Sequence, residues 1–316
     1  MFEQAKKLID NSKKIYIVGH TSPDGDAIGS SFAMCLALKK IGKDAKVLIT
    51  DYSDTFKFLP DFDTHVMNVI EDEYDLLIAV DSSDKTRLDI SEKDINKAKS
   101  ILMIDHHKMS APYGTVNCIQ DNMPATCQIM YEFISYLDID IDIDIATYLY
   151  TGIMTDTGSF NYSSTNARTM EIASILVSKG INFSDICRRL NETIKESKLK
   201  LIAKTIERME VFFDGKVRYS YVDYDTIQKL GLDEEDAEGM TNYLKMVENT
   251  EVAIYIRGKS NGSYKVSLRS AGNIKVSDIA IAFGGGGHPR AAGYTIEEDI
   301  SLGKKKLLEV LEVILK

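Results

Sequence analysis

The chain has 316 residues, of which 44% are hydrophobic and 27% are charged, and its net charge is −10. That length exceeds the most common domain size and predicts two domains, and the composition is that of an ordinary globular protein. The acidic balance argues against a long groove that binds nucleic acid of any sequence, because such grooves need a basic surface. A small phosphorylated ligand, held by a few arginines and a metal centre, is compatible with it.

No stretch approaches the roughly 20 apolar residues of a membrane span, and residues 1–14 lack the hydrophobic segment of a signal peptide. We therefore expect a cytoplasmic protein without a membrane partner. The four cysteines, Cys35, Cys118, Cys127 and Cys187, have no C-x-x-C spacing. We expect them to be buried free thiols and not disulfides or zinc ligands.

The first part of the chain alternates short apolar runs with helical patterns, which is typical of an open parallel sheet. Strands are expected over residues 15–18, 45–50, 76–80 and 101–104, and helices over residues 5–13, 27–41, 143–154 and 167–178. The Asp–Ile alternation over residues 138–145 could form a strand with a row of carboxylates. A solvated connection, in which Asp142 or Asp144 caps the next helix, is the preferred interpretation.

The pattern changes after a long helix expected over residues 184–209. Strands are then expected over residues 216–222, 251–257 and 264–269, and helices over residues 235–248, 276–283 and 302–315. We predict an α/β fold with a doubly wound, mainly parallel sheet in residues 1–185. A linker helix would occupy residues 186–210, and a smaller α/β domain residues 211–316.

Three of the expected strands end in acidic and histidine residues. His20, Asp24 and Asp26 follow the first strand, Asp81 follows the third, and Asp105-His106-His107 follows the fourth. Ligands of doubly wound sheets bind beyond the carboxyl ends of the strands, so one cleft is expected to gather these side chains. Asp156, after the helix expected over residues 143–154, adds a fourth acidic position.

Four ionised carboxylates in one cleft would repel one another. Each pair at ~4 Å costs roughly 1 kcal/mol in water and about 4 kcal/mol at an effective dielectric constant of 20. Two divalent cations would cancel these charges, and a mixture of histidine and carboxylate ligands suits Mn²⁺ better than Ca²⁺ or Mg²⁺. A two-metal pair, ~3.5–4 Å apart, clamps the attacking and leaving oxygens of an in-line phosphoryl displacement.

Other interpretations of these residues explain less. A single aspartate at a strand end is often only a helix cap or a turn residue. An EF-hand loop that began at Asp24 would have Cys35 where a glutamate is required. A phosphatase with an aspartyl-phosphate intermediate would give His20, His106 and His107 no role.

The acidic and histidine positions also resemble a known family. His20-x-x-x-Asp24-x-Asp26, Asp81, Asp105-His106-His107 and Asp156 look like the four motifs of the DHH phosphoesterases, in the family's order. Gly285-Gly286-Gly287-His288, followed by Ala291-Ala292-Gly293, looks like the motif of the DHH-associated domain. In length and two-domain layout the chain is most similar to the NrnA-type oligoribonucleases and 3′-phosphoadenosine 5′-phosphate (pAp) phosphatases.

The resemblance implies a role for each motif residue, with a water activated by the metals as the nucleophile. The first metal would be held by His20, Asp24 and Asp81, and the second by Asp26, Asp81, His106 and Asp156. His107 would face the substrate phosphate, and Asp105 would orient an imidazole.

The glycine-rich stretch of residues 284–287 is expected to be a loop whose amides can bind an anion. The resemblance to the DHH-associated domain implies that Gly285, Gly286, Gly287 and His288 bind substrate, together with Arg269, which could hold a terminal phosphate with two hydrogen bonds. Arg257, Arg290 and Arg168 are weaker candidates. Tyr113, Phe160 or Tyr162 could stack on a base, although ordinary packing is the more common role of such residues.

We predict a manganese-dependent phosphoesterase that hydrolyses short RNA oligonucleotides and converts pAp to AMP and phosphate. The nearest alternative is a phosphodiesterase for cyclic di-AMP or linear dinucleotides such as pApA. A RecJ-like single-strand exonuclease and a non-catalytic nucleotide sensor are weaker alternatives. Long duplex nucleic acid is not an expected partner, and the choice between a monomer and a homodimer stays open.

Overall fold

The computed structural model describes residues 1–234 and 236–315. The chain divides into two compact units, Met1–Thr193 and Ile194–Lys316. Within the described ranges, no helix combines the length and the apolar character that crossing a membrane would require.

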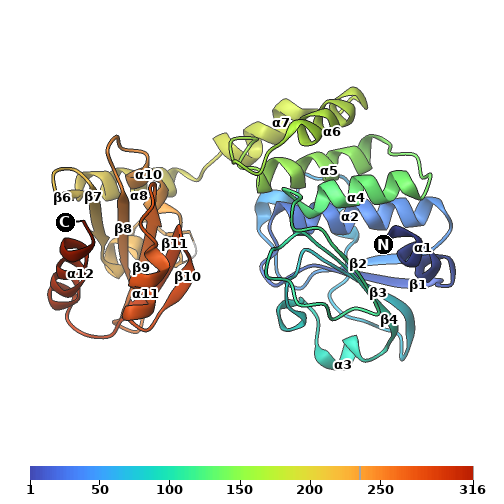
Figure 1. Ribbon diagram of the computed structural model, residues 1–316, viewed down its shortest axis with the longest axis horizontal. Coiled ribbons are helices and arrows are strands. Elements are labelled where there is room, and N and C mark those ends of the chain that lie inside the picture. Colours follow the sequence, from blue (N-terminus) through green and yellow to red (C-terminus); the bar gives the residue numbers. More distant parts are fainter. Residues whose placement is uncertain (235, 316) are drawn as a thin grey trace. The chain divides into compact units, whose positions relative to one another are not determined.

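The first unit is built on a five-stranded parallel sheet with the order β2-β1-β3-β4-β5 (Figure 1). The strands are β1 (Lys14–Val18), β2 (Asp44–Leu48), β3 (Tyr74–Val80), β4 (Ala98–Asp105) and β5 (Val116–Ile119). The strand order reverses between β1 and β3, which makes their carboxyl ends the topological switch point where such sheets bind ligands. The predicted fold class is confirmed, although β5 was not expected.

Alternate residues of these strands face two separate cores, as the period of two in a strand requires. Ile15 and Ile17 of β1 pack into the larger core with α2 (Gly25–Lys40), α4 (Thr126–Tyr136) and α5 (Ile143–Asp156). Tyr16 and Val18 face a smaller core that is covered by α3 (Glu92–Ile95) and by loops. Figure 1 shows α2, α4 and α5 on one side of the sheet and α3 on the other.

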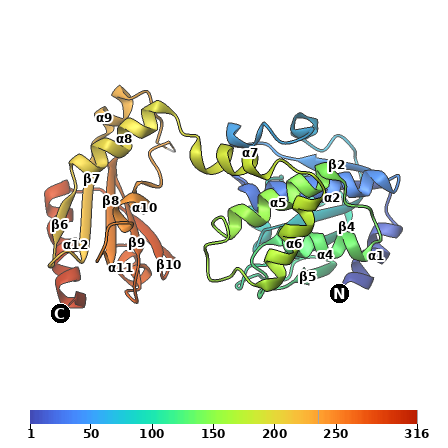
Figure 2. The ribbon, with the colours of Figure 1, turned by 90° about the horizontal axis from the view of Figure 1, so that it is seen from above.

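Two further helices and one helix cap complete this unit. The helix α1 (Phe2–Asp10) packs beside the sheet, and α6 (Ala167–Ser178) lies on α4 and α5 (Figure 2). The Asp142 carboxylate accepts a hydrogen bond from the Ile145 amide at 3.0 Å. Asp142 is therefore the cap of α5, as predicted.

Two glycines let the helices of the larger core approach closely. A Cβ on Gly29 of α2 would lie 2.6 Å from the Tyr148 carbonyl oxygen of α5, and one on Gly152 of α5 would lie 2.2 Å from Cys127 Sγ of α4. The rings of Phe32 and Tyr148 stack at 4.8 Å between α2 and α5. These contacts fix the first turns of α2 and α4 against the last turns of α5.

The helix predicted over residues 184–209 is two separate helical segments. The helix α7 (Phe183–Cys187) continues into a π-helical turn, Arg188–Glu192, and α8 (Glu196–Glu207) follows. Thr193 between them has an extended backbone, which suits a β-branched residue. Leu201 and Ile202 of α8 belong to a core of the second unit, so α8 is part of that unit and not a free linker.

The second unit contains a six-stranded mixed sheet with the order β10-β11-β9-β8-β7-β6, in which only β7 and β8 are parallel. The strands are β6 (Glu210–Phe212), β7 (Val217–Val222), β8 (Val252–Gly258), β9 (Tyr264–Ser270), β10 (Gly286–His288) and β11 (Ala291–Ile296). One face packs against α8, α9 (Tyr224–Lys229) and α10 (Met240–Lys245), and the other against α11 (Val276–Ala282) and α12 (Ile300–Leu315).

Two predictions for this unit need correction. The helix expected over residues 235–248 is only α10, and residue 235, its expected start, lies outside the described residues. The glycine-rich stretch of residues 284–287, which was expected to be a loop, is partly strand, because Gly286 and Gly287 belong to β10 and pair with β11 in a hairpin. A Cβ on Gly285 would lie 2.2 Å from the Gly293 carbonyl oxygen, and one on Gly287, whose φ is +139°, would lie 2.5 Å from that of Ala291. These glycines are needed for the close approach of the two strands.

Candidate metal centre

Asp81 lies at the centre of the predicted cluster. It directly follows β3, and its Oδ2 atom is 3.8 Å from His20 Nε2, beyond the end of β1. Its Oδ1 atom is 3.6 Å from His106 Nε2, beyond the end of β4. The parallel strands therefore bring three motifs that are far apart in sequence to one edge of the sheet.

Three overlapping groups of side chains meet here, and within each group the candidate ligand atoms lie within 4.8 Å of one another; the third group is Asp81, His106 and His107. The first group is His20, Asp24 and Asp81, with 4.0 Å between His20 Nε2 and Asp24 Oδ1. In the second group His106 Nε2 is 3.2 Å from Asp156 Oδ2 and 4.0 Å from Asp26 Oδ2. All six residues predicted as metal ligands thus lie together.

Backbone carbonyls orient the two imidazoles that face the cluster. The Nδ1 atom of His20 lies 2.8 Å from the Thr21 carbonyl oxygen, and that of His106 lies 3.1 Å from the Met123 carbonyl oxygen. With a proton on Nδ1 each ring donates to its carbonyl, which leaves Nε2 as a lone-pair donor toward the carboxylates.

His107 has a different surrounding. Its Nδ1 atom lies 2.7 Å from Asp105 Oδ1, and the Ser110 hydroxyl donates to the other oxygen of Asp105. The hydrogen bond to Asp105, opposed by burial and helped by the charge of Asp81, raises the pKa of His107 to about 9. Although burial opposes it, hydrogen bonds from His107 and Ser110 lower the pKa of Asp105. At neutral pH the pair is an imidazolium beside a buried carboxylate.

The central carboxylates are held in an environment that disfavours their charge. Burial, followed by the charge of Asp24, raises the pKa of Asp81 to about 6. Burial and the charges of Asp81 and Asp156 also raise the pKa of Asp26, which is fully buried. Burial is the main cause of the raised pKa of Asp156 as well.

Amide groups at the start of α4 partly offset this cost. The two oxygens of Asp26 accept hydrogen bonds from the amides of Thr126, at 2.6 Å, and Cys127, at 2.8 Å. The Thr126 hydroxyl donates to Asp81 Oδ1 at 3.0 Å. The positive end of the α4 dipole therefore faces two buried carboxylates, Asp26 and Asp81.

The backbone at the centre is also constrained. Asp81 has a φ of +54°, in the left-handed region that non-glycine residues seldom occupy. The Asp24 carboxylate caps α2 by accepting from the amides of Asp26, at 2.9 Å, and Ala27, at 3.1 Å. A Cβ on Gly25 would lie 2.4 Å from Thr155 Oγ1, so this glycine lets α2 begin against the end of α5.

The residues present fit divalent cations. The cluster offers carboxylate oxygens and imidazole Nε2 atoms, which are ligands of first-row divalent metals. A buried carboxylate whose charge is disfavoured gains most from a cation beside it. Thus the donor set and its electrostatics both match a metal centre.

In the second unit, Arg269 and His288 lie in one row across the sheet. Arg269 of β9 is paired with Ala291 of β11, and Ala291 is paired with His288 of β10. Paired residues point to the same face of a sheet, and the small side chain of Ala291 leaves space between the other two. The Arg269 Nη1 atom donates to the carbonyl oxygen of Leu268 at 3.2 Å.

Two of the weaker arginine candidates have structural partners. Arg257 is buried and lies within 3.3 Å of both Glu234 and Glu238. Arg168 makes a salt bridge of 2.8 Å with Glu132 on α4.

Comparison with known proteins decides the family. The model described as "DHH family, N-terminal domain" matches residues 14–153, and that of the DHHA1 domain matches residues 214–316. A Thermus thermophilus protein named bifunctional oligoribonuclease and PAP phosphatase NrnA is 30% identical over 308 residues, which cover 94% of this chain and 89% of that protein. The chain belongs to the DHH family.

Two further relatives set the range of the similarity. An exopolyphosphatase-related protein from Bacteroides fragilis has a similar structure, with a TM-score of 0.90 and 27% identity, covering 99% of this chain and 97% of that one. The cyclic-di-AMP phosphodiesterase PdeA of Listeria monocytogenes is 25% identical over 97% of this chain and 48% of that protein.

Sequence reasoning missed the residues that support the DHH motifs. The amides of Thr126 and Cys127, the Ser110 hydroxyl and the Met123 carbonyl oxygen all belong to a segment in which no element was predicted. Ile129, Met130, Phe133 and Ile134 are buried at helical spacing after Pro124. That pattern could have revealed α4, but no residue type signals that backbone amides will face Asp26.

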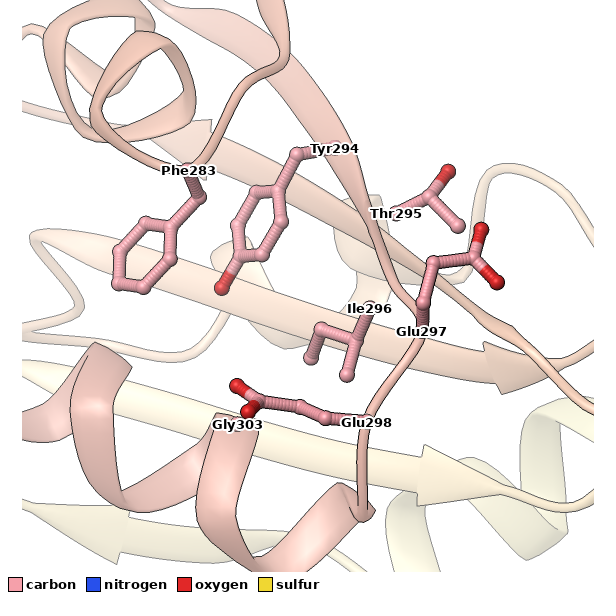
Figure 3. Close-up of a pocket in the computed structure, with 7 residues that line it drawn as sticks. All are labelled: Phe283, Tyr294, Thr295, Ile296, Glu297, Glu298 and Gly303. Atoms are coloured by element: carbon pink, nitrogen blue, oxygen red, sulfur yellow. The ribbon is translucent and has the colours of Figure 1, made fainter.

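The second unit, called the DHHA1 unit from here on because it contains the DHHA1 domain, also has a pocket of about 340 Å³ that does not resemble a phosphate site (Figure 3). It is lined by Phe283 and Tyr294, whose rings stack at 4.7 Å, and by Glu297 and Glu298. Tyr294 faces the core under α11 and α12, on the opposite side of the sheet from the Arg269 row. Two glutamates at its edge would repel a phosphate.

Proposed function

We propose that this protein is a two-metal phosphoesterase that hydrolyses short RNA oligonucleotides and removes the 3′-phosphate of pAp. The observation that carries the proposal is the position of Asp81, whose Oδ2 atom faces His20 and whose Oδ1 atom faces His106. A carboxylate shared in this way is the expected bridge of a two-metal centre. The name of the Thermus thermophilus relative supports this choice of substrates.

The ligand assignment combines the first two groups with the contact between Asp81 and His106. His20, Asp24 and Asp81 would hold one divalent ion, and Asp26, Asp81, His106 and Asp156 the other. Mn²⁺ is the ion we propose, because imidazole and carboxylate ligands occur together. Bound ions would polarise the phosphate and lower the pKa of the attacking water.

His107 would act on the substrate directly. Its Nδ1 atom is engaged by Asp105, which leaves an Nε2–H to donate to a phosphate oxygen or to protonate the leaving oxygen. Asp105 is a positioning residue in this scheme, since it fixes the ring and keeps it protonated.

In the DHHA1 unit we propose that Arg269 and His288 bind a terminal phosphate of the substrate. Both side chains point to one face of the sheet. Gly286, two residues before His288, is exposed, and a Cβ there would meet no other atom. An arginine guanidinium can make two parallel hydrogen bonds with a phosphate. Gly285 and Gly287 would contribute by keeping the hairpin closed.

The alternative substrate is a cyclic or linear dinucleotide. It is favoured by the similarity to the Listeria monocytogenes phosphodiesterase over nearly the whole chain. The two proposals share the metal centre and differ in the preferred substrate, which is short RNA and the 3′-phosphate monoester of pAp in the first and a cyclic or linear dinucleotide diester in the second.

A substrate panel tests the proposal. The purified protein is incubated with Mn²⁺ and with RNAs of two to five nucleotides, pAp, pApA and cyclic di-AMP, and products are separated by chromatography. We expect turnover of the short RNAs and of pAp. Faster turnover of cyclic di-AMP would favour the alternative, and turnover of none would favour a nucleotide sensor.

A further inference from the structure

The first unit contains a cavity of about 450 Å³. Its walls come from the loop that contains Ser53 and Phe56, from the segment after Asp156, and from Asn191 in the π-helical turn. Its volume is within the usual range of small-molecule sites.

The cavity adjoins the segment that carries the candidate ligand Asp156. Thr155 lines it, and this residue immediately precedes the candidate ligand Asp156. The Thr155 side chain also occupies the space beside Gly25, which separates Asp24 from Asp26. Thr155 therefore links the cavity to the residues around the metal centre, Asp24, Asp26 and Asp156.

The backbone that forms one wall is strained. Gly158, Ser159 and Phe160 have φ values of +55°, +56° and +65°, so three consecutive residues are left-handed and two of them are not glycine. The turn is held by hydrogen bonds from the Ser159 amide to the Met154 carbonyl oxygen, at 2.7 Å, and from the Phe160 amide to the Thr157 hydroxyl, at 3.0 Å. Such conformations cost of order 1–3 kcal/mol each and cluster at ligand sites.

The strained turn presents Tyr162 to solvent. The ring of Tyr162 packs directly on Gly158, because a Cβ built on this glycine would lie within 2.9 Å of three ring atoms. Despite this contact, 61% of Tyr162 is exposed. The other aromatic candidates are engaged elsewhere: Phe160 packs against Tyr150 with 6.0 Å between ring centroids, and the Tyr113 hydroxyl donates to the Ser82 carbonyl oxygen. Tyr162 therefore offers an aromatic surface that the core does not use.

Hydroxyl and amide groups complete the cavity. The Asn191 side chain donates to Ser159 Oγ at 2.9 Å, which leaves the hydroxyl proton of Ser159 free to donate to a ligand. The Ser53 and Thr55 hydroxyls, 2.9 Å apart, lie in the opposite wall. An aromatic surface beside several hydroxyls suits a nucleoside, whose base can stack while its ribose forms hydrogen bonds.

We propose that this cavity binds the ribonucleoside joined to the scissile phosphate, with its base stacked on Tyr162 and its ribose near Ser159. The inference rests on the proposed phosphoesterase function and adds a binding site for one substrate nucleoside. It assigns Tyr162 to substrate affinity and not to the chemical step.

The test compares base-bearing with base-free substrates. Tyr162→Ala, Tyr162→Leu and Tyr162→Phe are assayed with Mn²⁺ on pApA and on two analogues in which one or the other adenine is replaced by hydrogen. Tyr162→Leu keeps apolar contact with Gly158 but cannot stack. Tyr136→Ala is the matched control, because Tyr136 is a 49% exposed tyrosine on α4 that packs near Phe2.

We expect Tyr162→Ala and Tyr162→Leu to lower kcat/KM for pApA about tenfold or more through KM, since base stacking on aromatic side chains contributes at this level. Both variants should act like the wild type on the analogue that lacks the stacked base. Tyr162→Phe and Tyr136→Ala should keep wild-type kinetics on pApA.

Two results would overturn the inference: unchanged kinetics in Tyr162→Ala, or an equal loss on pApA and both analogues. An equal loss would mean that Tyr162 acts through the turn after Asp156. If the wild type hydrolyses none of the substrates, the proposed function fails. In that case the cavity proposal is tested by calorimetry, in which the binding of pApA and of its analogues is measured in the presence of Ca²⁺. Equal affinities of the wild type and Tyr162→Ala for pApA would count against the proposal.

Discussion

Replacing Asp81 by asparagine should stabilise the metal-free protein and abolish its response to Mn²⁺. Asp81 is 2% exposed, and its pKa is raised to about 6 by burial and by the charge of Asp24. Compared with about 3.9 in an unfolded chain, this difference destabilises the folded state at neutral pH by about 3 kcal/mol. Asparagine removes the charge, can still accept the hydrogen bond from Thr126, and tolerates the left-handed backbone.

The assay is thermal unfolding after metal removal with EDTA, repeated after dialysis and addition of Mn²⁺. A gain of about 3 kcal/mol corresponds to a rise of roughly 6–12 °C in Tm for a unit of this size. Wild-type protein should gain stability on addition of Mn²⁺ because only the folded state binds the ion, and Asp81→Asn should not.

Asp75, near the other end of β3, provides the matched control. Its carboxylate accepts hydrogen bonds from the Lys14 and Lys13 amides, at 3.0 Å each, and these bonds together with Lys99 hold its pKa well below the usual range. Asp75→Asn should therefore lower Tm both with and without metal and should keep the Mn²⁺ response. A metal-free Asp81→Asn protein that is less stable than the wild type would refute the electrostatic reasoning.

The same pKa also predicts a pH dependence. A carboxyl whose pKa is higher in the folded state contributes stability below its unfolded pKa, and this stability is lost as the pH rises through the folded value. Between about pH 4 and 6 the contribution of Asp81 should fall with rising pH. Metal-free wild-type protein should thus gain more stability than Asp81→Asn when the pH is lowered from 7 to 5.

Further predictions concern the groups around the metals and the DHHA1 hairpin. Asp105→Asn should lower kcat about 10- to 100-fold, as expected for loss of a group that orients His107. Its Mn²⁺ affinity, measured by calorimetry, should change little. Weaker metal binding with an unchanged kcat would contradict this role. Arg269→Ala should raise KM for short phosphorylated substrates about 10- to 100-fold, whereas Arg208→Ala, at a surface ion pair, should not. Gly287→Ala should lower Tm because its Cβ would meet Ala291 and Ala292. Gly286→Ala should keep the wild-type Tm because its Cβ would enter open space. A higher KM in Gly286→Ala would indicate that substrate approaches this backbone.

The strand-end motifs could be found from sequence because parallel strands place their carboxyl ends at one edge. An apolar run followed by an aspartate or histidine is a local signal, and it identified His20, Asp81 and His106 correctly as neighbours. The sequence predicts that these ends share one edge of the sheet, but their close contact also depends on the order, in which β1, β3 and β4 are neighbours.

The remaining features depend on contacts between distant segments. Asp26 and the amides of Thr126 and Cys127 are about 100 positions apart in the chain, and backbone amides have no sequence signature. The glycine-rich stretch was taken for a loop because glycine suits both mobile turns and close strand pairing, and only the neighbouring β11 distinguishes these. The break at Thr193 was hidden by helical residues on either side.

The unfavourable backbone of Asp81 has a consequence for protein engineering. The left-handed backbone of this residue costs free energy, and its burial disfavours the charged carboxylate. The folded protein is therefore less stable than it would be without this arrangement of candidate metal ligands. Screens that select heat-resistant variants in the absence of manganese should enrich substitutions at this position first, and they would yield robust but inactive proteins. Including the ion during selection should reverse that pressure.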